Sequence, residues 1–207
     1  MSLQPILFIV CGAVALGGAL AAITRRDALQ STVLLAAACL GVAGLFVLLE
    51  ALVVAALQLL LVAGIVFLIR LAPQAVREIA RANPGLSRRW WQAALVAAAL
   101  GGVFVWTAVV HYGGDSLLSW SLILAALLFC AGLYAVLARR DVVGVLMGVA
   151  VMLNGVSVNL AAFSGQVFAA AVYVVLVVEI VAGLAFGVAL WRSRGTAALD
   201  EADSLRE

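Results

Sequence analysis

Apolar residues run along this chain in seven long stretches that are separated by short polar segments. Each stretch is long enough for an α-helix to cross the hydrocarbon core of a bilayer, which takes roughly 20 residues. Because they lack the alternation of barrel strands, we predict helices that satisfy their own backbones. The stretches cover residues 5–23, 29–49, 51–72, 91–111, 117–137, 142–163 and 167–191.

Composition supports a membrane protein. Hydrophobic residues make up 67% of the 207 residues, and charged residues only 11%. A soluble domain keeps about a quarter of its residues charged, so most of this surface is not expected to face water. The predicted fold is an all-α, polytopic membrane bundle of about seven transmembrane helices, which excludes a soluble catalytic domain. No positive residues precede the first stretch, so it is interpreted as a retained helix.

Arginine placement predicts the topology. All 12 positive residues are arginines, and they lie only after the first, third, fifth and seventh stretches. Positively charged loops stay on the cytoplasmic side of a membrane. The N-terminus is therefore predicted outside and the C-terminus in the cytoplasm, with residues 195–207 as a polar cytoplasmic tail.

Two of the predicted cytoplasmic turns have similar sequences. TRRDALQSTV runs from Thr24 to Val33, and ARRDVVGVLM runs from Ala138 to Met147. They fit a parallel repeat of a helical hairpin. They also fit a generic cytoplasmic turn, with an aspartate near the next helix N-terminus. From the sequence we favour the generic turn, and the repeat stays open.

The chain contains no motif for a soluble cofactor: no Walker A loop, no Rossmann fingerprint and no HExxH. Its single histidine, His111, lies at a predicted helix end and is interpreted as interfacial. Cys11, Cys39 and Cys130 lie inside apolar stretches without metal-ligand spacing, and are interpreted as small packing residues. We therefore expect this chain to bind neither a cofactor nor a metal.

Glu179 lies near the middle of the last stretch, far from any other charge. A charge at the bilayer centre costs about 2.5–3.5 kcal/mol on insertion scales, and such residues normally face the bundle interior or a water path. We predict a role in proton transfer; the alternative is a neutral acid that is hydrogen-bonded between helices. Glu50 falls at a predicted outer turn, where we expect a solvated carboxylate.

Three polar residues, Asn154, Ser157 and Asn159, lie in the sixth stretch. Such side chains hydrogen-bond between membrane helices, and they are a candidate polar or water path. In the same stretch Gly144 and Gly148 form a small-xxx-small pair, which favours close helix packing.

The segment from residue 121 to 194 resembles subunit K of the bacterial NADH–quinone oxidoreductase, respiratory complex I. The resemblance rests on the RRD turn at residues 139–141, the MLN run at 152–154, the GQV turn at 165–167 and the E-x-x-x-GLA sequence from Glu179. These occur in the order and spacing of the family.

Residues 6–71 look like the first three helices of subunit J, through ITRRDALQSTVLL and ALVVAALQLLLVAG. The resemblance implies a fused chain, with a subunit J-like region at 1–112 and a subunit K-like region of three helices at 113–194. The J-like region would have four helices, one fewer than usual. Losing one span puts its end outside, where subunit K begins, in agreement with the arginine topology.

In this family two buried glutamates of subunit K belong to a lateral chain of polar groups between the quinone end and the antiporter-like subunits. One matches Glu179. The other falls at Ala150, which carries no proton, and the usual tyrosine of subunit J falls at Val62.

The resemblance implies a non-catalytic membrane-arm subunit in the bacterial inner membrane. It would couple the quinone module to the antiporter-like subunits, with NAD, flavin, iron–sulfur clusters and quinone bound elsewhere in the complex. One alternative is a subunit of a multisubunit cation/proton antiporter or of a membrane-bound hydrogenase. Others are a stand-alone transporter, and a structural scaffold that has lost proton transfer.

Overall fold

The computed structural model describes residues 3–25, 28–71, 90–112, 117–164 and 166–194. This part of the chain forms seven α-helices, which confirms the all-α prediction. They are α1 (Leu3–Thr24), α2 (Ala28–Leu48), α3 (Leu52–Leu71), α5 (Trp90–Tyr112), α6 (Leu117–Ala138), α7 (Val142–Ser164) and α8 (Gln166–Arg194).

Five of these helices, α1, α2, α5, α6 and α7, are long and apolar enough to cross a membrane. In α3 and α8 the described apolar parts are shorter, at Leu52–Gly64 and Val167–Gly183. The sidedness of the chain stays a prediction. Its proposed cytoplasmic tail, and most of the arginine-rich segment between α3 and α5, lie outside the described residues.

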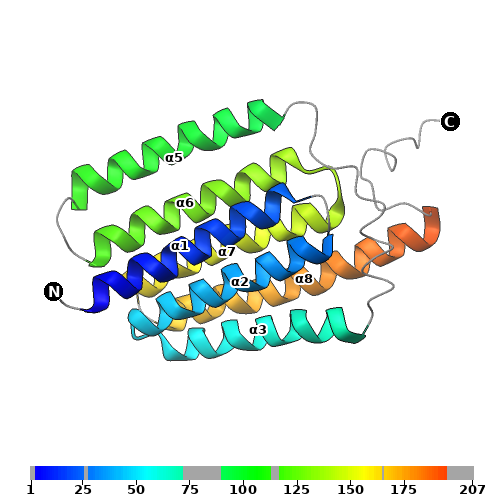
Figure 1. Ribbon diagram of the computed structural model, residues 1–207, viewed down its shortest axis with the longest axis horizontal. Coiled ribbons are helices and arrows are strands. Elements are labelled where there is room, and N and C mark those ends of the chain that lie inside the picture. Colours follow the sequence, from blue (N-terminus) through cyan, green and yellow to red (C-terminus); the bar gives the residue numbers. More distant parts are fainter. Residues whose placement is uncertain (1–2, 26–27, 72–89, 113–116, 165, 195–207) are drawn as a thin grey trace.

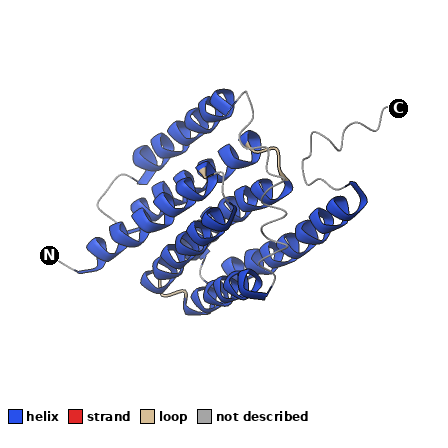
Figure 2. Ribbon diagram, turned by 45° about the vertical axis from the view of Figure 1, so that its right-hand side comes forward, coloured by secondary structure: helices blue, strands red, loops and turns tan. Residues whose placement is uncertain are grey.

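The helices form two packed layers and one outlying helix (Figures 1 and 2). One layer contains α1, α2 and α3, and the other contains α6, α7 and α8. Across the interface α1 contacts α6, α2 contacts α7, and α3 contacts α8. α5 packs on α6 at the edge of the second layer.

Glycine contacts show that the two layers are built alike. A Cβ added to Gly41 of α2 would lie 2.8 Å from the carbonyl oxygen of Cys11 and 2.7 Å from the amide nitrogen of Ala15, both on α1. Only a glycine allows this approach. The same backbone contact joins α7 to α6, with each residue number raised by 114. The corresponding residues are Gly155, Ala125 and Phe129.

A second glycine contact repeats with the same shift. Gly18 of α1 approaches the backbone of Ala38 on α2, and Gly132 of α6 approaches the backbone of Met152 on α7. Two pairs of helices thus cross at equivalent points, and the RRD turns are related by the same shift. A generic cytoplasmic turn does not require these matched crossings. The structure therefore supports the parallel repeat, which we did not favour from the sequence.

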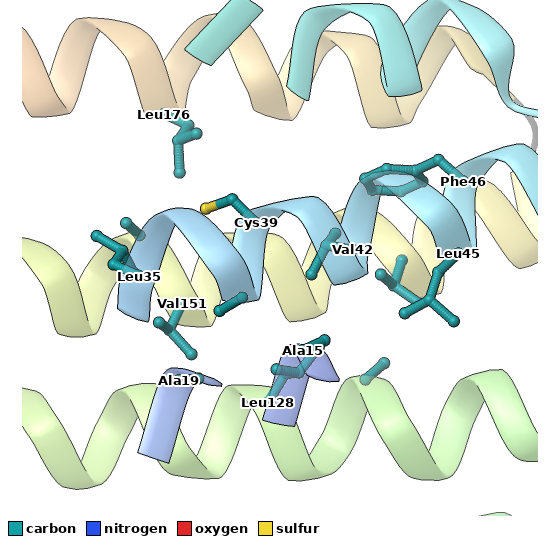
Figure 3. Packing of buried hydrophobic residues seen from close by; sticks show 14 of the residues in the cluster. Ala15, Ala19, Leu35, Cys39, Val42, Leu45, Phe46, Leu128, Val151 and Leu176 are labelled. Carbon is teal, nitrogen blue, oxygen red and sulfur yellow. The ribbon is translucent and has the colours of Figure 1, made fainter. Parts of the chain in front are cut away.

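Buried apolar residues fill the space between the layers, with α2 at the centre (Figure 3). Ala15 of α1 lies beside Leu128 of α6, and α2 contributes Val42, Leu45 and Phe46. Small residues let helix backbones approach closely in lipid, where van der Waals packing replaces the hydrophobic effect. These contacts fix the level at which the two layers meet.

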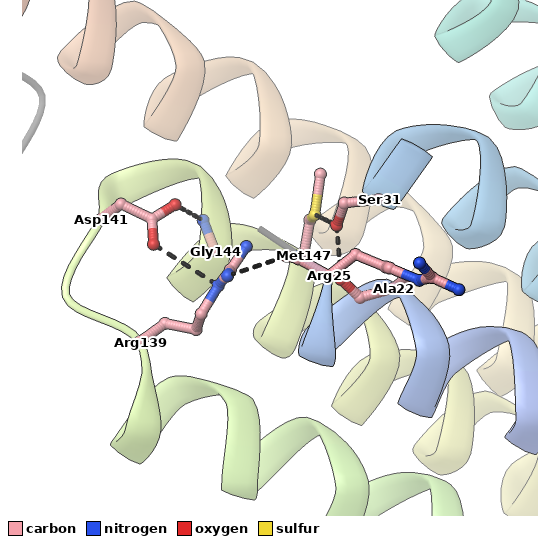
Figure 4. A network of polar contacts seen from close by, with 7 residues as sticks. All are labelled: Ala22, Arg25, Ser31, Arg139, Asp141, Gly144 and Met147. Carbon is pink, nitrogen blue, oxygen red and sulfur yellow. Dashed lines mark hydrogen bonds and ion pairs between the residues drawn. The ribbon is translucent and has the colours of Figure 1, made fainter. Parts of the chain in front are cut away.

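A polar network joins the layers near the two RRD turns (Figure 4). Arg139 Nη1 donates to the carbonyl oxygen of Arg25 at 3.3 Å, and its Nε lies 3.4 Å from Asp141 Oδ1. The other oxygen of Asp141 accepts from the Gly144 N–H at 2.7 Å, which caps the start of α7. Arg26 and Asp27 lie outside the described residues.

The two glycines that were predicted to pack against another helix have different roles. Gly148 does so, since an added Cβ would lie 2.9 Å from the Gly132 carbonyl oxygen of α6. At Gly144 an added Cβ would instead meet the side chains of Arg139 and Asp141. Gly144 therefore makes room for the ion pair rather than for a helix, which corrects the prediction.

Candidate functional site: buried polar groups between the layers

Glu179 lies at the edge of the buried face of α8. Its side chain is half-buried, between the buried Leu176 one turn earlier and the half-buried Gly183 one turn later. A Cβ added to Gly183 would collide with the side chain of Leu146 on α7. The Leu146 side chain of α7 therefore packs directly on α8 at Gly183, one turn from Glu179.

Ala150 lies at the level of Glu179. α7 and α8 are neighbours joined by a single residue, so they run in opposite directions. One turn forward along α7 leads from Leu146 to Ala150, and one turn back along α8 leads from Gly183 to Glu179. Because the helices are antiparallel, both steps go in the same direction. Ala150 is buried, and Glu179 is the only acidic residue in the two helix sequences. This level of the bundle thus has a single carboxyl group from this helix pair.

One to two turns away from Glu179, four buried side chains from four helices meet. Tyr173 of α8 places its hydroxyl against Gln58 Oε1 of α3 and 2.7 Å from Asn154 Oδ1 of α7. Gln58 Nε2 donates to the carbonyl oxygen of Cys39 on α2 at 3.2 Å. The Asn154 amide lies 3.9 Å from Cys39 Sγ. We call Cys39, Gln58, Asn154 and Tyr173 the polar ring; none of them is more than 4% exposed.

Counting protons fixes the direction of the hydrogen bonds in the polar ring. A hydroxyl has one hydrogen, so Tyr173 does not donate to two carbonyl oxygens at once. Gln58 keeps its orientation, because its amide nitrogen donates to the Cys39 carbonyl. Turning the Asn154 amide, whose nitrogen and oxygen have the same shape, lets it donate to the Tyr173 oxygen. Its oxygen then faces the Cys39 thiol, and the Tyr173 hydroxyl donates to Gln58 Oε1 alone.

Each layer contributes two side chains to the polar ring, from its second and third helices. Cys39 and Gln58 come from α2 and α3, and Asn154 and Tyr173 come from α7 and α8. With the shift of 114 residues that relates the glycine contacts, Cys39 corresponds to Leu153 rather than to Asn154, so the polar ring is not itself part of the repeat. The ring edge of Phe46 packs on Tyr173, with the two centroids 5.8 Å apart. The polar ring therefore holds the two layers in one register from inside an apolar interface.

The structure separates the predicted polar path on α7. Asn154 belongs to the polar ring, and Ser157 is buried one turn later. Asn159 points elsewhere, because it lines a cavity formed with α5 and α6. Asn154 and Asn159 thus have different surroundings, and a polar path that uses all three residues stays a prediction.

Sequence reasoning missed Gln58 and Tyr173, and it treated Cys39 only as a packing residue. The available signal was a glutamine in an apolar stretch, since a buried amide needs partners. The partners of Gln58 lie on two other helices, α2 and α8, and no spacing in the sequence points to them. Val62, where the family tyrosine would fall, is buried and apolar.

The other residues singled out from the sequence also lie in the described part of the chain. Glu50 is exposed at the turn between α2 and α3, where we expected a solvated residue, and its φ is 60°. His111 lies in the last turn of α5, and its Nδ1 is 3.1 Å from the Thr107 carbonyl oxygen. Within the described ranges no group of three or more His, Cys, Asp or Glu residues could hold a metal ion. Cys11, Cys39 and Cys130 are free thiols.

Comparison with known proteins assigns the C-terminal region. The family model for NADH-ubiquinone/plastoquinone oxidoreductase chain 4L matches residues 120–207. Residues before this segment are not covered by that match, and no solved structure matches the chain.

Curated relatives agree with the family match. NADH-quinone oxidoreductase subunit K 2 of Streptomyces griseus is 47% identical over 92 residues, which are 40% of this chain and 62% of that protein. Subunit K of a Geobacillus species is 43% identical over 98 residues, 43% of this chain and 94% of the relative. Subunit 4L of a Synechocystis NAD(P)H-quinone oxidoreductase is 39% identical over 98 residues, 43% of this chain and 95% of the relative. Through α6, α7 and α8, the chain therefore belongs to the subunit K/4L family of NADH-quinone oxidoreductase, respiratory complex I.

Proposed function

We propose that this chain is a fused J–K subunit of the membrane arm of a proton-translocating NADH–quinone oxidoreductase in the bacterial inner membrane. It would couple the quinone module to the antiporter-like subunits, without a catalytic centre of its own. The cofactors of complex I lie in other subunits. The supporting observation is Glu179, the one acidic residue in the sequences of α7 and α8, inside the family region and one turn from the contact of Gly183 with Leu146.

Glu179 is the proposed proton-transfer group. Its half-buried position at the edge of the buried face leaves one side of the carboxyl group outside the α7–α8 contact. A carboxyl group that faced hydrocarbon there would be costly. We therefore expect a neighbouring subunit to cover it with polar groups, and to supply the proton path that Ala150 interrupts within this chain.

The assignment of the N-terminal layer to subunit J remains part of the proposal. It rests on the resemblance of residues 6–71, with α5 as the fourth J-like helix. The matched glycine contacts add that α1–α2 and α6–α7 share one hairpin geometry. In the first layer the residue 114 positions before Glu179 is Ile65, so the repeat does not supply a second carboxyl group.

The experiment is Glu179→Gln in membrane vesicles that contain the assembled complex. We expect NADH oxidation to continue while the protons moved per electron fall at least severalfold, because glutamine has the shape of glutamate without its proton exchange. Glu50→Gln is the matched control, since that carboxylate lies in an exposed turn. Unchanged proton movement in Glu179→Gln would favour a structural scaffold.

The identity of the complex is tested by purifying the tagged chain in mild detergent and sequencing the accompanying proteins. Quinone-module and antiporter-like subunits together with a flavin-bearing NADH module would support complex I. A nickel-site subunit would indicate a membrane-bound hydrogenase, and antiporter-like subunits alone a cation/proton antiporter. A stable chain without partners would indicate a stand-alone transporter.

A further inference from the structure

A cavity lies between α5, α6 and α7, away from the polar ring and Glu179. It encloses about 350 Å³. α5 packs on α6 rather than in the two-layer core, so the cavity runs between α5 and α7 with α6 as its base. We call it the α5–α7 slot.

The lining of the α5–α7 slot changes from apolar to polar along its length. Phe104 and Phe129 lie at its inner end, where their rings meet edge to face with centroids 6.3 Å apart. Ala126 lines the apolar middle. His111 and Asn159 line the opposite end, near the last turn of α5 and toward the end of α7. The slot thus has an apolar floor and a polar mouth.

Aromatic residues place this mouth at the membrane surface. Trp90 begins α5 and is exposed, and exposed Trp120 lies in the first turn of α6, beside the mouth. Tryptophans gather at both membrane–water interfaces. The 22 residues of Trp90–His111 extend for about 33 Å at 1.5 Å per residue, close to the hydrocarbon thickness. His111 therefore lies at the level of lipid headgroups.

We propose that the α5–α7 slot binds one acyl chain of a phospholipid, with the phosphate and ester oxygens at His111 and Asn159. The Nδ1 of His111 faces the Thr107 carbonyl oxygen, so Nδ1 holds a proton there, and Nε2 donates to a phosphate oxygen when it carries a proton as well. The Asn159 amide is a second hydrogen-bond donor for ester or phosphate oxygens.

Other occupants fit the slot less well. Water alone is disfavoured, since cavities with apolar walls stay dry. An acyl chain is thin, apolar and present at high concentration around a membrane-spanning bundle.

The test counts phospholipids that stay bound to the tagged full chain, together with its accompanying subunits, after mild-detergent purification and native mass spectrometry. Ala126→Phe fills the slot from a half-buried position, and Ala98→Phe adds the same ring to the exposed face of α5. We expect wild type and Ala98→Phe to retain one more phospholipid per chain than Ala126→Phe. Asn159→Leu should lose that lipid at a lower detergent concentration than wild type.

Equal phospholipid counts in wild type and a correctly assembled Ala126→Phe would overturn the proposal. So would loss of a protein subunit, instead of a lipid, from Ala126→Phe, or retention of a quinone in place of a phospholipid. If Ala126→Phe does not assemble, Asn159→Leu decides: lipid retention identical to wild type rejects the slot as a phospholipid site. None of these outcomes depends on whether Glu179 transfers protons.

Discussion

The Tyr173 hydroxyl is buried between the amide side chains of Gln58 and Asn154, and its loss would leave the atom of each amide that faces it without that partner. We predict that Tyr173→Phe lowers the free energy of unfolding by about 1–3 kcal/mol, the cost of buried unsatisfied polar groups. Tyr134→Phe on α6 is the matched control, because this half-buried tyrosine is not part of the polar ring. The measurement is the thermal midpoint of the purified protein. Equal midpoints for the two variants would contradict the closed polar ring.

The backbone of Glu50 has a left-handed conformation, with φ at 60°. The Ala51 N–H donates to the Phe46 carbonyl oxygen at 2.8 Å, which closes the end of α2 around this residue. A side chain in this conformation costs roughly 1–2 kcal/mol, part of which glycine recovers. We predict that Glu50→Gly is more stable than Glu50→Ala in thermal unfolding, as both remove the carboxylate. A Glu50→Gly variant that is less stable than Glu50→Ala would contradict backbone strain at this residue.

At the scale of helices, glycines decide how closely α1 and α2 approach. Gly41 faces the α1 backbone, whereas an added Cβ at Gly17 meets nothing within 4 Å. We predict that Gly41→Ala destabilises the protein by about 1–3 kcal/mol through overpacking. Gly17→Ala should be neutral or stabilising by up to about 1 kcal/mol, because alanine favours helix. In thermal unfolding, a lower midpoint for Gly41→Ala and an unchanged or higher midpoint for Gly17→Ala would confirm the crossing point. Equal shifts of the midpoint in the two variants would refute it.

At the scale of the whole molecule, one arginine joins the two layers at the RRD turns. Arg139 is buried beside the buried Asp141. We predict that Arg139→Gln costs about 3–5 kcal/mol, because removing one partner leaves a buried charge unpaired. Arg25→Gln is the control, since Arg25 is exposed and takes part through its backbone carbonyl, which the substitution keeps. A similar loss of stability in both variants would argue against the ion pair.

The seven helices and the candidate carboxyl group of Glu179 could be predicted from the sequence alone. A long apolar run has only one stable form in lipid, a helix with internal backbone hydrogen bonds, and this decision is local to each run. The isolation of Glu179 is likewise visible in one stretch. The helix ends were predicted within a few residues, although α8 continues to Arg194, three residues past the predicted end.

Only the tertiary structure decided which helix faces meet. In lipid both the buried and the outer faces of a helix are apolar, so hydrophobicity does not show which side packs. The polar ring requires Gln58 of one layer and Tyr173 of the other layer to lie at the same level of the bundle. The separation of Asn159 from Asn154, and the role of Gly144 beside Arg139, depend on helix rotation and crossing point. The rotation and the crossing point of each helix are set where two backbones approach closely. Many residues that are distant in sequence determine these approaches together.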